Sequence, residues 1–136
     1  MPRFLFAMLV AAAIPVSANA QMTDASTIRP ILEATKASWI GVRRWDGQDL
    51  VYFTHLETWR CALASIYFSV NDTAAEPYGL IPCKEGQGSP APISATDHTP
   101  FVSFPLDSIS TVTIEVIYKD GVTSVANYQR NAIELP

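Results

Sequence analysis

The sequence predicts a mainly β fold, a small antiparallel β-sandwich with one short N-terminal helix, and three observations support this class. Short segments in which apolar and polar residues alternate recur between residues 39 and 130, as expected of half-buried strands. Asp-Gly pairs at residues 46–47 and 120–121 are strong hairpin signals. Apolar residues at helical spacing lie mainly ahead of the first strand. About six to seven short strands with such turns are typical of a sandwich, and a partly open β-barrel is the alternative.

Residues 1–20 have the three parts of a secretory signal peptide. Arg3 supplies a positive charge, residues 4–14 form an unbroken apolar run, and Ala18-Asn19-Ala20 is a small-residue cleavage pattern. The run is too short to cross a bilayer, which takes about 20 apolar residues. We therefore expect a periplasmic or secreted protein. Its residues 21–136 would form a single disulfide-linked β domain, with no integral membrane segment left after cleavage.

The first element of that domain is predicted to be a short amphipathic helix over residues 30–36. Ile28, Ile31 and Leu32 recur near helical spacing, and Thr27 is a candidate N-cap. A helix of this kind would cover one open face or end of a sheet.

A hairpin is predicted over residues 39–55. A two-residue loop at Asp46-Gly47 places Val42 opposite Val51, so that one face becomes a core face. The opposite face carries aromatic rings and an arginine, which suit a protein, peptide or glycan ligand. The candidate binding residues on that face are Trp39, Arg43, Trp45 and Tyr52. The alternative is that these side chains form a second, covered core layer.

The remaining strands follow from similar patterns. Residues 59–70 are expected to form a strand that ends in an Asn71-Asp72-Thr73 turn. This turn also matches a glycosylation sequon, although a surface turn explains the same residues. Residues 77–83 form an edge strap, because prolines interrupt them, and residues 84–100 form a long loop.

A second hairpin is predicted over residues 110–130, after a short strand at 101–106. Its first strand alternates cleanly, with a buried face made by Val112, Ile114, Val116 and Tyr118. The returning strand, 122–128, is a candidate edge for pairing with another chain.

The two cysteines, Cys61 and Cys83, predict one disulfide. An even cysteine count in an exported chain favours pairing, and the spacing is far from that of a C-x-x-C metal site. The cross-link closes a 22-residue separation, for which the chain-entropy model gives about 3 kcal/mol.

Evidence for catalysis is weak. His55 and Glu57 would share a face if they lay on one strand, and Asp97 and His98 from the long loop could complete a base–carboxylate or metal site. No serine lies in a G-x-S-x-G or S-x-x-K motif. We therefore name His55, Glu57, Asp97 and His98 as weak catalytic candidates only, and we expect no cofactor and no metal.

The charge balance argues against a nucleic-acid partner. Once Arg3 leaves with the signal peptide, eight basic and 13 acidic residues remain, a net charge of −5. Binding to phosphate backbones needs clustered Lys and Arg. The leading expectation is therefore a non-catalytic binding or envelope-associated module with an unidentified protein, peptide or glycan ligand. The alternative is a small hydrolase or metal-binding enzyme that uses the four candidates above.

Overall fold

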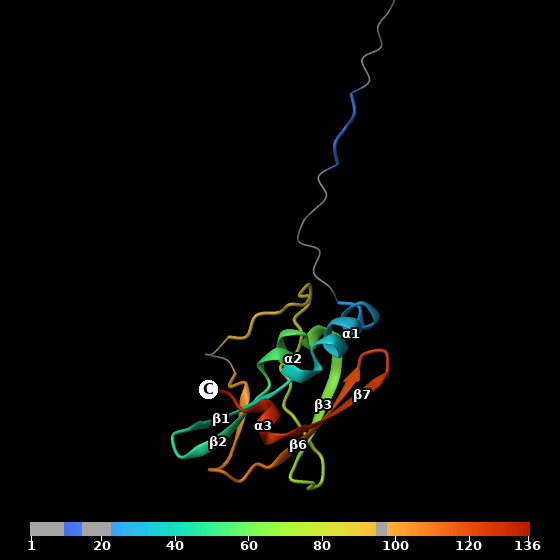
Figure 1. Ribbon diagram of the computed structural model, residues 1–136. Helices are drawn as coiled ribbons and strands as arrows, with labels where there is room; N and C mark the ends of the chain where they lie inside the picture. The colour runs from blue at the N-terminus through green and yellow to red at the C-terminus, as the bar shows by residue number, and fades with distance from the viewer. Residues whose placement is uncertain (1–9, 15–22, 95–97) are drawn as a thin grey trace, which may run out of the picture.

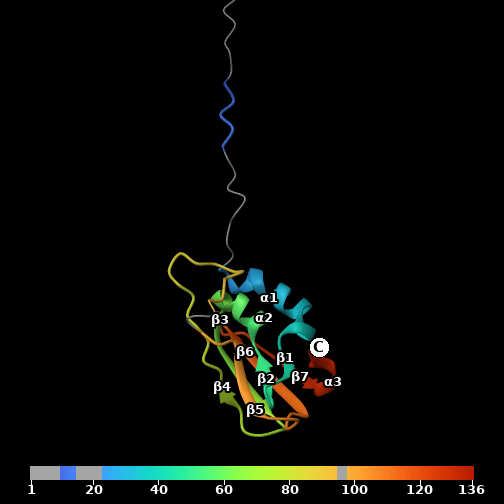
Figure 2. The same ribbon diagram turned by 90° about the vertical axis from the view of Figure 1, so that its left-hand side faces the viewer.

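The computed structural model describes residues 10–14, 23–94 and 98–136, and its strands form two antiparallel sheets. Figures 1 and 2 show the two sheets with helices at their ends. The three-stranded sheet has the order β1-β2-β5, from Gly41–Trp45, Gln48–Tyr52 and Phe101–Pro105. The four-stranded sheet has the order β4-β3-β6-β7, from Glu76–Pro77, Leu63–Val70, Thr111–Tyr118 and Thr123–Gln129. The predicted mainly β, sandwich-like class is confirmed, with two separate sheets rather than a closed barrel.

Both predicted hairpins form. In the first, Val42 pairs with Val51 and the turn residues Asp46 and Gly47 have φ of 51° and 71°. This left-handed backbone is the reason for an Asp-Gly turn, since glycine adopts it without cost and aspartate tolerates it. In the second hairpin β6 pairs with β7, and the burial of β6 alternates along its whole length.

The core lies between the inner faces of the two sheets. Val42 and Val51 of the first sheet are fully buried, as are Ile66 and Ile114 of the second. The ring of Phe104 meets that of Phe68 edge-on, with centroids 6.4 Å apart, and so joins β5 to β3. Apolar residues at alternate positions of both sheets therefore share one core.

Helix α1 (Ala25–Ala34) begins earlier than the sequence pattern suggests. Asp24 is its N-cap, and its carboxylate accepts hydrogen bonds from the Ser26 backbone N–H at 3.4 Å and from the Thr27 hydroxyl at 3.1 Å. Thr27 is therefore a bonding partner within the first turn and not the cap. The helix lies at one end of the sheets, beside the β6–β7 turn (Figure 1), where Arg29 forms an ion pair with Asp120.

The segment after β2 turns into short helices instead of continuing as a strand. Helix α2 spans Thr54–Thr58, and the 3₁₀ helix η2 spans Arg60–Ala62, so that β3 starts at Leu63. The expectation of a strand from residue 59 is therefore wrong over its first four positions. A second 3₁₀ helix, η1 (Lys36–Ser38), follows α1.

The last residues of the described chain bond to β1 and pack against it. After helix α3 (Arg130–Ile133), the Leu135 N–H donates to the Val42 carbonyl at 2.8 Å. The Leu135 side chain lies so close to Gly41 that a Cβ there would meet it at 2.7 Å. Glycine at position 41 thus permits this close approach.

Within the described residues, no helix has the length and apolar character needed to cross a membrane. Most of the predicted signal peptide, residues 1–20, lies outside the described part of the chain. Its residues 10–14 carry neither helix nor strand.

Candidate functional site

The outer face of the three-stranded sheet is a regular grid of nine positions, which we call the outer platform. Directly paired residues of antiparallel strands point to the same face, so the registers of β1 with β2 and of β2 with β5 define three rows. From one end to the other these rows are Gly41–Tyr52–Phe101, Arg43–Leu50–Ser103 and Trp45–Gln48–Pro105. Three of the four predicted binding residues, Arg43, Trp45 and Tyr52, therefore share this surface.

Aromatic rings mark both ends of the outer platform. Trp45 is 57% exposed, and the Arg43 guanidinium lies over its ring at 4.3 Å from the centroid. At the other end, the rings of Tyr52 and Phe101 are tilted against each other with centroids 5.2 Å apart. Leu50, between the two ends, is buried although it lies outside the main core. The platform thus has two aromatic ends, while Leu50 at its centre is buried and Gly41 is covered by Leu135.

Trp39 does not belong to the platform. Its side chain is fully buried, and the indole Nε1 donates to the Leu32 carbonyl at 2.8 Å. It lies between η1 and β1, where the chain has not yet adopted the strand alternation on which the prediction relied. The structure therefore excludes Trp39 from the exposed face and places it in the core.

His55 and Glu57 lie on α2, and their side chains diverge. Residues two apart on a helix are separated by about 200° around its axis, whereas the prediction assumed a strand with both on one face. The His55 Nε2 contacts the Thr35 hydroxyl at 2.9 Å, and burial lowers the pKa of His55. His55 lines an apolar pocket of about 490 Å³ beside Tyr52, away from the partners of Glu57.

Glu57 and His98 do come together. The Glu57 carboxylate is fully buried, and its Oε1 lies 2.5 Å from the His98 Nε2 and also accepts a hydrogen bond from the Tyr78 hydroxyl. Burial, together with the neighbouring Glu57, raises the pKa of Tyr78, so the phenol remains a donor. A carboxylate that orients an imidazole is the arrangement of a general base and its support. A catalytic role for this pair stays a prediction.

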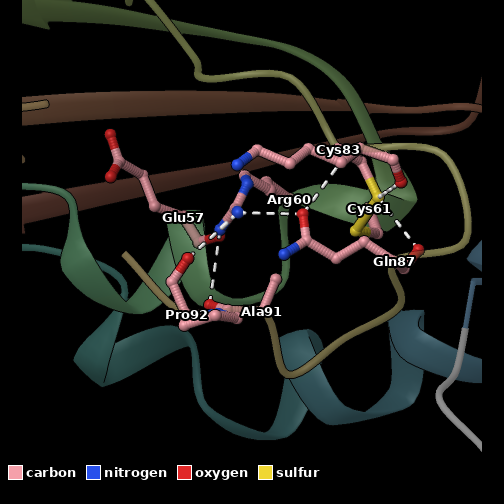
Figure 3. Close-up of a disulfide and its surroundings, with 8 residues drawn as sticks. Glu57, Arg60, Cys61, Cys83, Gln87, Ala91 and Pro92 are labelled. Carbon is pink, nitrogen blue, oxygen red and sulfur yellow. Dashed lines mark hydrogen bonds between the residues drawn. A yellow bond between two sulfur atoms is a disulfide. The ribbon is translucent and has the colours of Figure 1, made fainter. Parts of the chain in front are cut away.

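Sequence reasoning missed Arg60, which is 3% exposed. Its Nη1 donates to the backbone carbonyls of Glu57 and Ala91, at 3.0 and 3.3 Å. Its Nη2 donates to the Gln87 side-chain oxygen at 3.1 Å and to the Pro92 carbonyl at 3.0 Å. Figure 3 shows this network beside the disulfide. No local pattern predicts this network, because three of the four acceptors lie 27 to 32 residues further along the chain.

The predicted disulfide between Cys61 and Cys83 is present. It joins η2 to the strap that follows β4, next to Arg60 (Figure 3). Cys61 is buried, while Cys83 is partly exposed.

The fourth catalytic candidate, Asp97, lies outside the described residues. Among residues 10–14, 23–94 and 98–136, no group of three or more His, Cys, Asp or Glu side chains is placed to hold a metal ion.

In comparisons with protein-family models, curated proteins and solved structures, nothing matches this chain. Functional inference therefore rests on the geometry described above.

Proposed function

We propose that this protein is an exported, non-catalytic binding module whose outer platform holds a short oligosaccharide. The exposed Trp45 at one end of the outer platform is the observation that carries the proposal. The N-terminal signal pattern and the disulfide support export.

The size of the platform favours a short ligand over a folded protein. Its rows span four residues of β1, about 13 Å at 3.3 Å per residue, and its three strands span about 10 Å. The resulting footprint of about 130 Å² is far below the roughly 800 Å² that each partner buries in a stable protein–protein interface. A linear ligand of a few units fits this footprint.

The chemistry of the platform favours a sugar over a peptide. The backbone groups of β2, its central strand, are engaged in ladders on both sides, so the face offers side chains only. An extended peptide placed there would lack partners for its own N–H and C=O groups. Sugar rings can stack on Trp45 and on the Tyr52–Phe101 pair, while Gln48 and Ser103 offer hydrogen bonds at exposed positions.

The test compares two variants on a panel of soluble oligosaccharides of two to six units. Calorimetry or heteronuclear NMR is expected to find at least one binder whose affinity falls about tenfold in Trp45→Ala, because an exposed aromatic anchor contributes on the order of 1–2 kcal/mol. Val125→Ala is the matched control, since Val125 is 47% exposed on the other sheet. It should bind as the unaltered protein does.

A matching panel of two- to six-residue peptides identifies the ligand class. Peptides that bind through Trp45 while every sugar fails would replace the oligosaccharide by a peptide. If no compound is affected by Trp45→Ala, although the variant melts as the unaltered protein does, the platform is not the binding site.

A further inference from the structure

The cations of the described chain divide into two groups. Arg29, Arg44 and Arg130 form ion pairs with carboxylates, as does Lys36. Arg60, Lys84 and Lys119 form no ion pair with any carboxylate that the structure describes. All three line pockets on either side of the strap. Arg43, which also forms no ion pair with a described carboxylate, stacks over Trp45 on the outer platform. The other three unpaired cations of the described chain lie around one strap.

One of these pockets has the size and lining of a small-molecule site. Its volume is about 510 Å³, within the range of roughly 300–1,000 Å³ that is usual for ligand pockets. Apolar walls come from the strap and from the long loop, as Ile81, Pro82, Pro92 and Ile93. The polar lining is Arg60, Lys84, Gln87, Ser94 and His98, with no aspartate or glutamate among the described lining residues.

Arg60 supplies buried positive charge that forms no ion pair with any carboxylate among the described residues. All four of its hydrogen bonds go to neutral oxygens, three backbone carbonyls and one amide. Its Nε is buried and has no partner in the described chain. A buried charge without a counter-charge is costly, and an anion in the pocket would remove that cost.

Glu57 does not neutralise the guanidinium. Figure 3 shows its carboxylate directed away from Arg60, and the Oε1 oxygen is occupied by Tyr78 and His98. The backbone carbonyl of Glu57, rather than its side chain, accepts from Arg60.

The pocket is held open in advance of any ligand. The disulfide fixes the strap to η2 on one side. On the other side, Arg60 holds the loop through Ala91 and Pro92, and the Ala91 N–H donates to the Thr58 carbonyl at 2.8 Å. Walls fixed in this way lower the ordering cost of binding.

We propose that this pocket binds the carboxylate of a small amphipathic molecule, with the carboxylate near Arg60 and Lys84 and the apolar body against the isoleucine and proline walls. A carboxylate suits the site better than a phosphate group, because most Arg60 donors are already engaged and Lys84 adds only one charge. This site is separate from the outer platform, and neither proposal depends on the other.

The experiment uses octanoate as the probe and octanamide as its neutral counterpart. Titration calorimetry and NMR of the oxidised protein are expected to show saturable octanoate binding, with shifts at His98 and Ile93. Octanamide should bind at least tenfold more weakly. Affinity should also fall as salt is added, because the charges at the rim are screened.

Lys84→Ala provides the decisive variant, because Lys84 lies on an exposed turn and its loss should leave the fold intact. We expect it to weaken octanoate binding about five- to tenfold, whereas Lys36→Ala, which removes a lysine paired with Glu33 on α1, should have no effect. Equal affinity for octanoate and octanamide, or an unchanged affinity in Lys84→Ala, would overturn the proposal.

A second arm distinguishes two sources of the same chemistry. A tripeptide with apolar side chains is titrated as the free acid and as the C-terminal amide. If the tripeptide acid binds but its amide does not, and if Lys84→Ala weakens this binding, the site is assigned to peptide C-termini. Binding of octanoate alone assigns it to acyl carboxylates. Failure of every carboxylate contradicts the proposal, and this outcome is independent of any result at Trp45.

Discussion

Asp49 is a fully buried carboxylate whose main ionic partner, Arg130, is distant in sequence. Arg130 binds it through two hydrogen bonds, Nη1 to Oδ2 at 2.6 Å and Nη2 to Oδ1 at 3.0 Å, and the Ile109 N–H also donates to it at 3.3 Å. The bond to Arg130 is the main cause that lowers the pKa of Asp49 to about 2. This contact fixes β2 to the start of α3.

The pair predicts how stability depends on pH. Because the folded pKa of Asp49 is depressed, its contribution is fully present above the unfolded value near 3.8 and is lost as the pH falls towards 2. The free energy of unfolding, measured by denaturant titration between pH 5 and pH 2, should fall by about 2 kcal/mol from this group. Asp49→Asn should cost about 3 kcal/mol at neutral pH and flatten the slope. An unaltered slope in this variant would exclude Asp49 as the cause.

Asn71 lies in a glycosylation sequon, and in the structure its side-chain amide forms hydrogen bonds within the protein. Its side-chain nitrogen donates to the Ser108 carbonyl at 2.6 Å, and its side-chain oxygen accepts from the N–H groups of Ser110 and Thr111 at 2.7 and 3.1 Å. The side-chain amide of Asn71 therefore joins the turn after β3 to the start of β6. The surface-turn interpretation of Asn71-Asp72-Thr73 agrees with this role.

At the scale of elements, local patterns were sufficient for the hairpins. The Asp46-Gly47 turn and the alternation beside it predict the pairing of Val42 with Val51, and the structure has this register. The second hairpin was predicted equally well, because its turn and its alternating strand lie within a few residues of each other.

Elements that depend on distant partners could not be predicted in the same way. Helix α2 is too short to be stable by itself, and its N-cap residue, Phe53, makes no side-chain capping hydrogen bond. The third column of the outer platform comes from β5, and nothing near Phe101 indicates that it pairs with Tyr52. Two of the three columns of the outer platform were therefore visible in the sequence, and the third depends on pairing across about 50 residues.

At the scale of the whole molecule, the disulfide restricts the unfolded chain. Its 22-residue separation predicts that reduction lowers the free energy of unfolding by about 3 kcal/mol and the melting temperature by about 10 °C. Calorimetry with and without reductant measures this effect, and the Cys61→Ala/Cys83→Ala double variant is the control, because it should melt low in both conditions. Equal melting temperatures of the oxidised and reduced protein would contradict the role given to the cross-link.

The disulfide and the Arg60 hydrogen bonds that hold the long loop have a consequence for proteolysis. Exposed loops with small and polar residues are usual sites of nicking, and Lys84 offers trypsin a bond at the surface. The chain around Lys84 is nevertheless held on one side by the disulfide at Cys83 and on the other by hydrogen bonds from Arg60 to Ala91 and Pro92. We expect the oxidised protein to resist cleavage after Lys84 and the reduced protein to be cut there early, as mass spectrometry of a timed digest would show. Equal cleavage rates would mean that the loop opens freely despite its bonds. With the expected difference in rate, a digestion gel reports the redox state of the folded chain.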